Sequence, residues 1–316
     1  MVTSKTNPSK EHVLSKMGPQ TRKIAIAAAA VVLIVLVVAS AKWLRGSGTI
    51  DGFLTVYPGH AMLPTTAPTG FPSWLGWQHF LNLFFLVLII RSGWRVRRVS
   101  RPDAYWTRNN SGLIRTKGAP GKISLDLWIH LLLDAFWLIN GVVFVGLLIA
   151  TGHWVRIVPT SWDVFPNALS AALQYASLDW PTENGWVSYN ALQLLAYFLI
   201  VFVAAPLAFM SGIRMSGIWP QNNRRLNKVY PMTLARAVHF PVMIFFVVFV
   251  VTHVFLVLAT GALRNLNHIY AGADDNGWLG FWLFLGSLVV ISAAVALARP
   301  VFIRPIASLM GTVSKR

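Results

Sequence analysis

Six long apolar segments, separated by polar stretches, dominate the pattern of hydrophobic and polar positions along the chain. A transmembrane helix needs about 20 mostly apolar residues, and each segment is close to that length. The pattern therefore predicts an all-α integral membrane protein with six transmembrane helices. The predicted helices cover Ile24–Ala41, Trp74–Trp94, Leu127–Thr151, Tyr189–Ile213, Val238–Gly261 and Trp278–Ala298. A shorter stretch, Phe165–Leu178, predicts a surface helix between the third and the fourth.

The first apolar segment fits two kinds of element. Basic residues precede it, and Ala39-Ser40-Ala41 at its end resembles a signal-peptide cleavage site. Its apolar run is long for a signal peptide, so we expect an uncleaved anchor at residues 24–41 after a cytoplasmic tail at residues 1–23. Both alternatives place Lys42 outside the cytoplasm.

The distribution of charge predicts which loops are cytoplasmic. The chain has 27 Lys and Arg but only 10 Asp and Glu, and 55% of its residues are hydrophobic. With six spans, 23 of the basic residues fall on one side, and Lys42, Arg45, Arg156 and Arg264 fall on the other. Because cytoplasmic loops are enriched in Lys and Arg, we expect both termini in the cytoplasm, with a tail at residues 299–316. The net charge of +17 is then a topology signal and does not indicate nucleic-acid binding.

The cofactor chemistry open to the chain is limited by its lack of cysteine. Disulfides, cysteine-ligated iron–sulfur clusters and thioether-linked haem are excluded, so histidine is the main candidate ligand. Four of the eight histidines lie inside predicted helices, where an ionisable residue is costly and usually functional. These four are His79, His130, His239 and His253.

The spacing of these histidines predicts two pairs. His239 and His253 are 14 residues apart on one predicted helix. At about 100° and about 1.5 Å per residue, both project from one face and lie about 21 Å apart along the axis. The alternating helix directions place His79 at the depth of His253, near the outer surface, and His130 at the depth of His239, near the inner surface. Two bis-histidine haem sites follow, and iron with both axial positions filled suits electron transfer better than oxygen binding.

Hydrogen bonding between helices is the simplest role without haem for these four histidines. A lone histidine in a membrane helix more often forms such a bond, and a proton-coupled transporter without haem is the main alternative function. The absence of inverted repeats and the single buried acid, Asp134, count against a transporter. A zinc site is disfavoured because neither pair has a third ligand nearby. We expect His60, His153 and His268 at the outer surface or at an interface.

Arginines near the predicted inner histidines are candidates for binding the carboxylates of the inner haem. The candidates are Arg91, Arg214 and Arg236. Arg91 could instead pair with Asp134, which lies one turn after His130.

Four short segments around the histidines carry a resemblance to a known family. They are Gly76–Asn82 (GWQHFLN), Tyr189–Gln193 (YNALQ), Pro206–Gly212 (PLAFMSG) and the stretch from His239 to Leu256. In order, they resemble the bacterial di-haem cytochrome b subunits: the Ni/Fe-hydrogenase b-type cytochrome, the formate dehydrogenase gamma subunit and the thiosulfate reductase cytochrome b subunit. The family core has four helices with one, one, no and two haem ligands. The resemblance covers residues 74–272 and implies a four-helix haem-binding core, with additional helices at 24–41 and 278–298.

The resemblance implies a function for the whole chain. It implies two haem b groups that pass electrons between a quinone and a catalytic oxidoreductase subunit. The quinone would be menaquinone or ubiquinone, and the catalytic subunit would contain molybdopterin or nickel. An iron–sulfur subunit can be present or absent. It also implies the bacterial cytoplasmic membrane as the location, and a quinone headgroup beside Asn190 and Gln193. A stand-alone haem membrane reductase is the alternative, although such enzymes usually carry two histidines on each of two helices.

Overall fold

The computed structural model describes residues 18–110, 120–180 and 184–315. Six of its helices are long and apolar enough to cross a membrane, as the hydrophobic pattern predicts. They are α2 (Pro19–Gly46), α4 (Ser73–Arg98), α5 (Leu125–Ala150), a composite helix Ala191–Met215, α10 (Met232–Ala259) and α12 (Leu279–Leu297). The protein is therefore an all-α, multi-pass membrane protein. Most of the N-terminal tail predicted at residues 1–23 lies outside the described residues, as does residue 316.

The long helices extend beyond the apolar segments because polar residues continue them at one end. Helix α10 begins at Met232, six residues before the expected start, directly after Pro231 at its N-cap. Proline has its φ preset near the helical value and has no N–H to satisfy, so it suits a helix start. Helix α4 continues through three arginines of its last turn, which interact favourably with the helix dipole.

The chain divides into two compact units, and the first of them contains the N-terminal helix. This unit comprises Met1–Met62, Trp162–Thr182 and Asn190–Leu192, and its described elements include α2, α3 (Asp51–Val56) and α6 (Val164–Ala176). Helix α6 is the short helix predicted at 165–178. Arg45 at the end of α2 forms an ion pair of 2.7 Å with Asp179 and donates a hydrogen bond of 2.6 Å to Ser177, just after α6. These contacts join α2 to the segment that follows α6.

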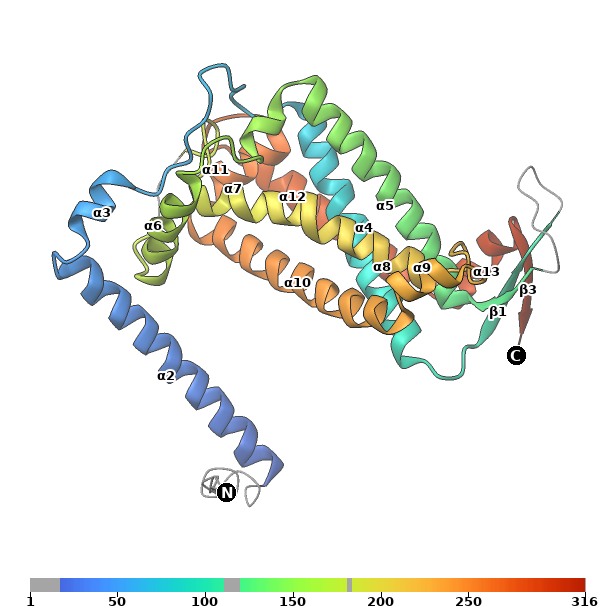
Figure 1. Ribbon diagram of the computed structural model, residues 1–316. Coiled ribbons are helices and arrows are strands. Elements are labelled where there is room, and N and C mark those ends of the chain that lie inside the picture. The colour runs from blue at the N-terminus through green and yellow to red at the C-terminus, as the bar shows by residue number, and fades with distance from the viewer. Residues whose placement is uncertain (1–17, 111–119, 181–183, 316) are drawn as a thin grey trace. The chain divides into compact units, whose positions relative to one another are not determined.

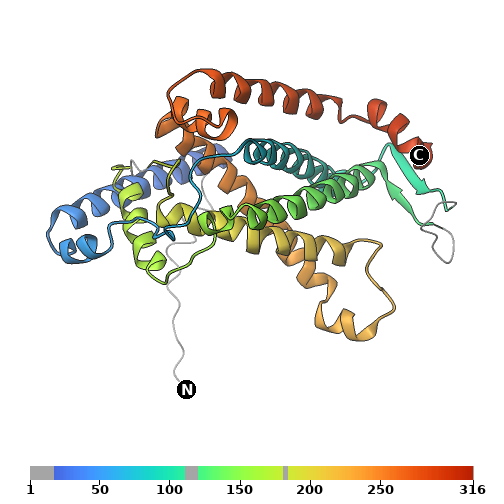
Figure 2. The ribbon, with the colours of Figure 1, turned by 90° about the horizontal axis from the view of Figure 1, so that it is seen from above.

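The second unit comprises Leu63–Ser161, Glu183–Tyr189 and Gln193–Arg316 and contains the helices that carry the four candidate histidines. Within it, α4 packs along α5, and α8 (Ala205–Met215) packs along α10, as Figures 1 and 2 show. Helix α12 packs on α4 and on a π-helical turn, η3 (Asn267–Ala271), that follows α11 (Ala262–Leu266). The core of this unit is thus two helix pairs, α4–α5 and α8–α10.

The composite helix Ala191–Met215 changes its winding in the middle. It consists of α7 (Ala191–Phe198), a π-helical segment η2 (Leu199–Ala204) and α8. Pro206 lies just after the π segment and has no N–H for the usual bond to residue 202. The wider turn before Pro206 accommodates this lost bond, and such π segments are frequent at functional sites.

One end of the second unit carries a small sheet that the hydropathy pattern does not predict; we call it the sheet end. Strand β1 (Ala104–Arg108) lies between β2 (Lys122–Ser124) and β3 (Gly311–Lys315), and both neighbours are antiparallel to it. In register, Trp106 lies opposite Ile123 and Val313. The predicted tail at 299–316 therefore forms α13 (Pro300–Ser308) and β3 over its described part.

A hydrophobic cluster holds this sheet to the helices. Its buried members are Ala104, Leu125, Trp128, Ile303 and Ala307. The indole Nε1 of Trp106 also donates a hydrogen bond of 3.0 Å to the backbone oxygen of Ala307. The opposite end of the unit carries α11, η3 and a 3₁₀ turn, η1 (His153–Arg156), and we call it the α11 end.

Candidate cofactor site

The four histidines of the transmembrane helices lie in two pairs within the second unit. At the α11 end, the ring centroids of His79 on α4 and His253 on α10 are 6.2 Å apart. Toward the sheet end, those of His130 on α5 and His239 on α10 are 6.4 Å apart. The structure thus brings together the residues that the sequence places at matching depths.

The separation within each pair suits one metal ion between two imidazoles. A metal–imidazole bond is about 2.0 Å long and a ring centroid lies about 1.1 Å beyond its nitrogen, so rings on opposite sides of one ion have centroids about 6.2 Å apart. Both observed separations are within 0.2 Å of that distance. Each imidazole pair could therefore hold one metal ion, such as the iron of a haem.

Two serines orient the rings of the pair near the sheet end. Ser92 Oγ lies 3.0 Å from His130 Nδ1, and Ser211 Oγ lies 2.9 Å from His239 Nδ1. Each hydroxyl donates its only proton to a backbone oxygen of its own helix, that of Ile89 for Ser92. With the hydroxyl protons used in this way, the serine oxygens can accept hydrogen bonds from Nδ1–H groups, and in that tautomer both Nε2 atoms are unprotonated and able to bind a metal. Ligating histidines usually have such a partner on the other ring nitrogen.

Two glycines give these rings room. A Cβ atom on Gly93 would lie 3.0 Å from Cε1 of His130, which is closer than ordinary van der Waals contact. A Cβ atom on Gly212 would lie 3.7 Å from Cε1 of His239, an ordinary contact distance. Gly93 is thus required for the present position of His130, whereas Gly212 has spare room.

The pair at the α11 end is enclosed by aromatic rings. Phe249 stacks on His253 at 5.5 Å and 4°, and Tyr197 meets His253 edge-on at 6.0 Å. Tyr270 meets His79 edge-on at 5.7 Å. His79 Nδ1 is buried and has no hydrogen-bond partner among the described residues. His79 Nδ1 therefore makes no hydrogen bond between helices among the described residues, which is the role that a lone histidine in a membrane helix most often has.

An aromatic contact lies between the two pairs. Trp137 lies seven residues after His130 on α5, and Phe246 lies midway between His239 and His253 on α10. Seven residues are nearly two full turns, so each ring shares a face with the histidines of its helix. The two rings meet edge-on at 6.1 Å, and Phe246 is buried.

The three arginines proposed for the carboxylates of the inner haem lie in different surroundings. Arg214, one turn after Ser211 on α8, is 5% exposed, whereas Arg236 is exposed and Arg91 half-buried. No ion pair joins Arg91 to Asp134 in the part of the chain that the structure describes, and the Asp134 carboxylate lies 3.6 Å from His130 Nε2 instead. That distance is too long for a hydrogen bond. Of the three, Arg214 is best placed for a buried anion.

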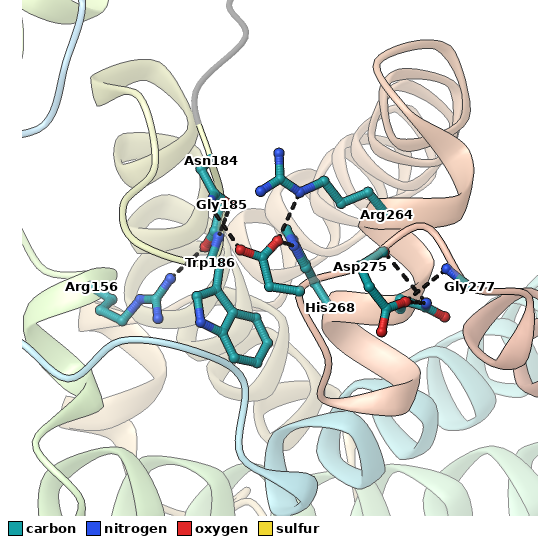
Figure 3. Close-up of polar contacts among 10 residues, drawn as sticks. Arg156, Asn184, Gly185, Trp186, Arg264, His268, Asp275 and Gly277 are labelled. Atoms are coloured by element: carbon teal, nitrogen blue, oxygen red, sulfur yellow. Dashed lines mark hydrogen bonds and ion pairs between the residues drawn. The ribbon is translucent and has the colours of Figure 1, made fainter.

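A polar cluster covers the α11 end of the second unit. Figure 3 shows Arg264 and His268 converging on one carboxylate, that of Asp274, each at 2.7 Å. Asn184 donates to the same carboxylate at 3.2 Å. Hydrogen bonds from Arg264 and His268 hold the pKa of the Asp274 carboxyl well below its usual range. The cluster thus ties the segment before α7 to the segment after α11.

Two of the three histidines expected at the outer surface or at an interface are buried within the chain, so the surface alternative was wrong for them. His268 is 3% exposed and packs against Phe71, stacked at 5.6 Å and 14°, and against Trp186, at 5.5 Å. His153 is 8% exposed, and burial lowers its pKa. Hydropathy gives no signal for this burial, because loop segments far apart in sequence create it. His60 is exposed.

The residues proposed for a quinone headgroup belong to different units. Asn190 is 1% exposed, and its amide donates a hydrogen bond of 3.0 Å to the hydroxyl of Tyr175 within the first unit. Gln193 belongs to the second unit and is half-buried.

The sequence reasoning missed Ser92, Ser211 and Arg156. A signal for the serines exists: each is a hydroxyl residue in a predicted membrane helix at the depth of a histidine. Arg156 entered the sequence reasoning only through the charge distribution. Its burial depends on loop carbonyls from residues 68–70 and 185, which no local pattern reveals.

Comparisons with known proteins find a similarity to a reductase subunit. The chain is 28% identical over 202 residues to a protein of Azospira oryzae, the putative protein-methionine-sulfoxide reductase subunit YedZ1. The match covers 59% of this chain and 88% of YedZ1. No protein-family model matches the chain. No solved structure matches it either.

Proposed function

We propose that this protein is a di-haem b-type cytochrome subunit that carries electrons between the quinone pool and a catalytic oxidoreductase subunit. The observation that carries the proposal is the pair of ring separations, 6.2 Å for His79 and His253 and 6.4 Å for His130 and His239. If the histidines only formed hydrogen bonds between helices, nothing would require both imidazole pairs to have the ring separation that fits one metal ion. Neither pair has a direct hydrogen bond between its rings among the described contacts.

The residues of the chain have separate roles in this proposal. Haem with two imidazole ligands supplies one-electron transfer and leaves no open position for oxygen. The four histidines would hold the two irons, and Ser92 and Ser211 would keep two of the rings in the tautomer that binds metal. The aromatic enclosure around the pair at the α11 end keeps water away from the ligands.

The similarity to YedZ1, which is named a putative protein-methionine-sulfoxide reductase subunit, supports a subunit that works with a reductase. YedZ1 is named as a subunit, so its catalytic function involves another chain. We propose the same division for this protein, in which the substrate chemistry belongs to a separate catalytic chain. That chain would be a molybdopterin or nickel enzyme, and a sulfoxide reductase is the first candidate to test. The bacterial cytoplasmic membrane and cytoplasmic termini belong to the same proposal.

The spectrum of the purified chain tests the haem assignment. The full chain, purified in detergent, should show the α band of haem b in a reduced-minus-oxidised spectrum and should contain two haems per chain. His79→Ala and His253→Ala should each remove the same spectral component, and His130→Ala and His239→Ala should remove the other. The exposed His60, changed to Ala, is the control and should retain both. A colourless protein would contradict the proposal and favour a proton-coupled transporter. Loss of the same spectral component from the variants of both histidine pairs would also contradict it.

The quinone link has its own test. Gln193→Ala should slow the reduction of haem by a quinol in membranes while leaving reduction by dithionite unchanged. An unchanged rate with quinol would remove Gln193 from the quinone site and leave the haem assignment in place.

A further inference from the structure

Arg156 is a buried charge whose described contacts include no anion. Its side chain is 3% exposed. Nη1 donates to the backbone oxygen of Gly70 at 2.7 Å, and more weakly to that of Pro68 at 3.4 Å, while Nη2 donates to that of Gly185 at 2.6 Å. Nε is buried and has no hydrogen-bond partner among the described residues. Because burying a cation without an anion is costly, this guanidinium is suited to an anionic ligand.

The position of Arg156 relates it to the histidine pair at the α11 end. Its guanidinium lies 5.1 Å from the ring centroid of Tyr189. Tyr189 meets Tyr197 edge-on at 5.0 Å, and Tyr197 meets His253 edge-on at 6.0 Å. These contacts connect the arginine to the histidine through two tyrosine rings, and all four residues belong to the second unit.

The opposite end of the same unit has a matching arginine. Arg214 is also buried, at 5% exposure, and its Nη1 has no hydrogen-bond partner in the described part of the chain. Its Nε donates to the backbone oxygen of Tyr230 at 2.6 Å, and the guanidinium lies over the ring of Trp219 at 5.0 Å. These two are the buried arginines among the described residues, and each lies at one end of the helix core that holds the histidine pairs.

We propose that Arg156 binds a carboxylate of the group held between His79 and His253, a haem propionate, through its unpartnered Nε–H. This inference rests on the proposed haem function. The two propionates are the anionic groups of haem b, and a guanidinium presents N–H donors in a planar arrangement that matches a carboxylate. Arg156 is then the counterpart, at the α11 end, of Arg214 near the sheet end. Its bonds to Gly70 and Gly185 hold the guanidinium in place before the ligand arrives.

A purely structural role is the competing explanation, because the same hydrogen bonds also clamp two loops. The experiment must therefore separate the loss of a carboxylate contact from the loss of a clamp. Haem whose propionates are methyl esters provides that separation, since it keeps the iron and the ring but lacks the anions. The binding affinities of proteins with and without Arg156 for haem with and without free carboxylates form a double-mutant cycle for the carboxylate contact.

The cycle uses the full-length chain with His130→Ala, which confines haem binding to the His79–His253 site. This chain should bind ordinary haem about 10- to 100-fold more tightly than the dimethyl ester, as expected for a charge-assisted hydrogen bond. With Arg156→Gln added, the two haems should bind with nearly equal affinity. If Arg156→Gln instead weakens both haems by the same factor, Arg156 is only a clamp and the inference is wrong.

A second variant and a second readout keep the inference testable if Arg156→Gln does not fold. Arg156→Lys retains the charge and should preserve most of the preference for ordinary haem; a complete loss would refute the electrostatic part. In the chain with all four histidines, Arg156→Gln should lower the midpoint potential only of the haem that His79→Ala removes. A tenfold change in the reduced-to-oxidised ratio corresponds to about 59 mV for one electron. Arg214→Gln is the matched control and should move only the other haem. Failure of wild-type protein to bind haem would refute the proposed function itself, a result distinct from each of these.

Discussion

Gly93 and Gly212 offer a matched pair of substitutions that tests the geometry around His130. Both glycines lie in helices of the core, and each faces the imidazole of one member of the same histidine pair. Gly93→Ala would place a Cβ atom 3.0 Å from Cε1 of His130, so the ring would have to move by a few tenths of an ångström. Gly212→Ala would place its Cβ atom 3.7 Å from Cε1 of His239, where nothing has to move.

The difference between the two variants has a definite sign and size. Replacing glycine by alanine inside a helix stabilises the helix by about 1 kcal/mol, and this gain is common to both variants. Overpacking a filled site costs about 1–3 kcal/mol, and this cost applies only to Gly93→Ala. Because His130 is held to Ser92 by a bond of 3.0 Å, the displaced ring loses either that bond or its alignment with His239. At about 1.4 kcal/mol per factor of ten, haem at this site should dissociate about 5- to 150-fold more readily.

The assay is the amplitude of each haem component after purified protein is challenged with excess apomyoglobin, a haem acceptor. Gly93→Ala should lose the component that His130→Ala removes, while the other component stays at the wild-type level. Gly212→Ala should retain both. Equal retention by the two glycine variants would show that His130 does not have to stay where the structure places it, and the reasoning from contact distances would fail.

Three further predictions concern other parts of the second unit. Ser211→Ala removes the acceptor of His239 Nδ1–H, and haem affinity at that site should fall about 10- to 100-fold in a haem titration. Asp274→Asn should lower the thermal stability at pH 7. Because the folded-state pKa of Asp274 is depressed, the difference in stability from wild type should shrink as the pH falls below about 4. A difference that does not depend on pH would contradict the ion-pair explanation. Gly280→Ala should strongly destabilise the chain, because its Cβ would collide with the backbone of Leu266, whereas Gly286→Ala on the same helix meets nothing and should be tolerated in a melting experiment.

The membrane helices were predictable because their signal is local. A run of about 20 apolar residues identifies a spanning helix without knowledge of its neighbours, and all six predicted spans are present as helices. The spacing of His239 and His253 depends only on helix geometry, so their common face was also predictable. Their partners, His79 and His130, could be matched by depth in the membrane alone. Successive spanning helices run in opposite directions, so the position of a residue along its helix gives its depth.

The remaining features depend on contacts between distant segments. His268 is buried because Phe71 and Trp186 lie against it, and nothing near residue 268 in the sequence indicates either ring. The sheet at residues 104–108, 122–124 and 311–315 joins a loop to the last part of the chain through short strands of mixed polarity, which give no clear alternation. Charge counting predicts that these segments are cytoplasmic but contains no information about their pairing.

The Trp137–Phe246 contact has an electrical consequence. It places aromatic rings between the two histidine pairs, which α10 separates by 14 residues, or about 21 Å of helix. A phenyl ring carries no polar group and an indole N–H can donate but not accept, so neither ring relays a proton. In the proposed function, an electron passing between the two sites would then move without an accompanying proton along that route. The step would span about two-thirds of a hydrocarbon core of about 30 Å. A membrane voltage of 100 mV would then change the free energy of this electron-transfer step by about 1.5 kcal/mol. The rate of transfer between the two haem sites would therefore depend on the membrane voltage.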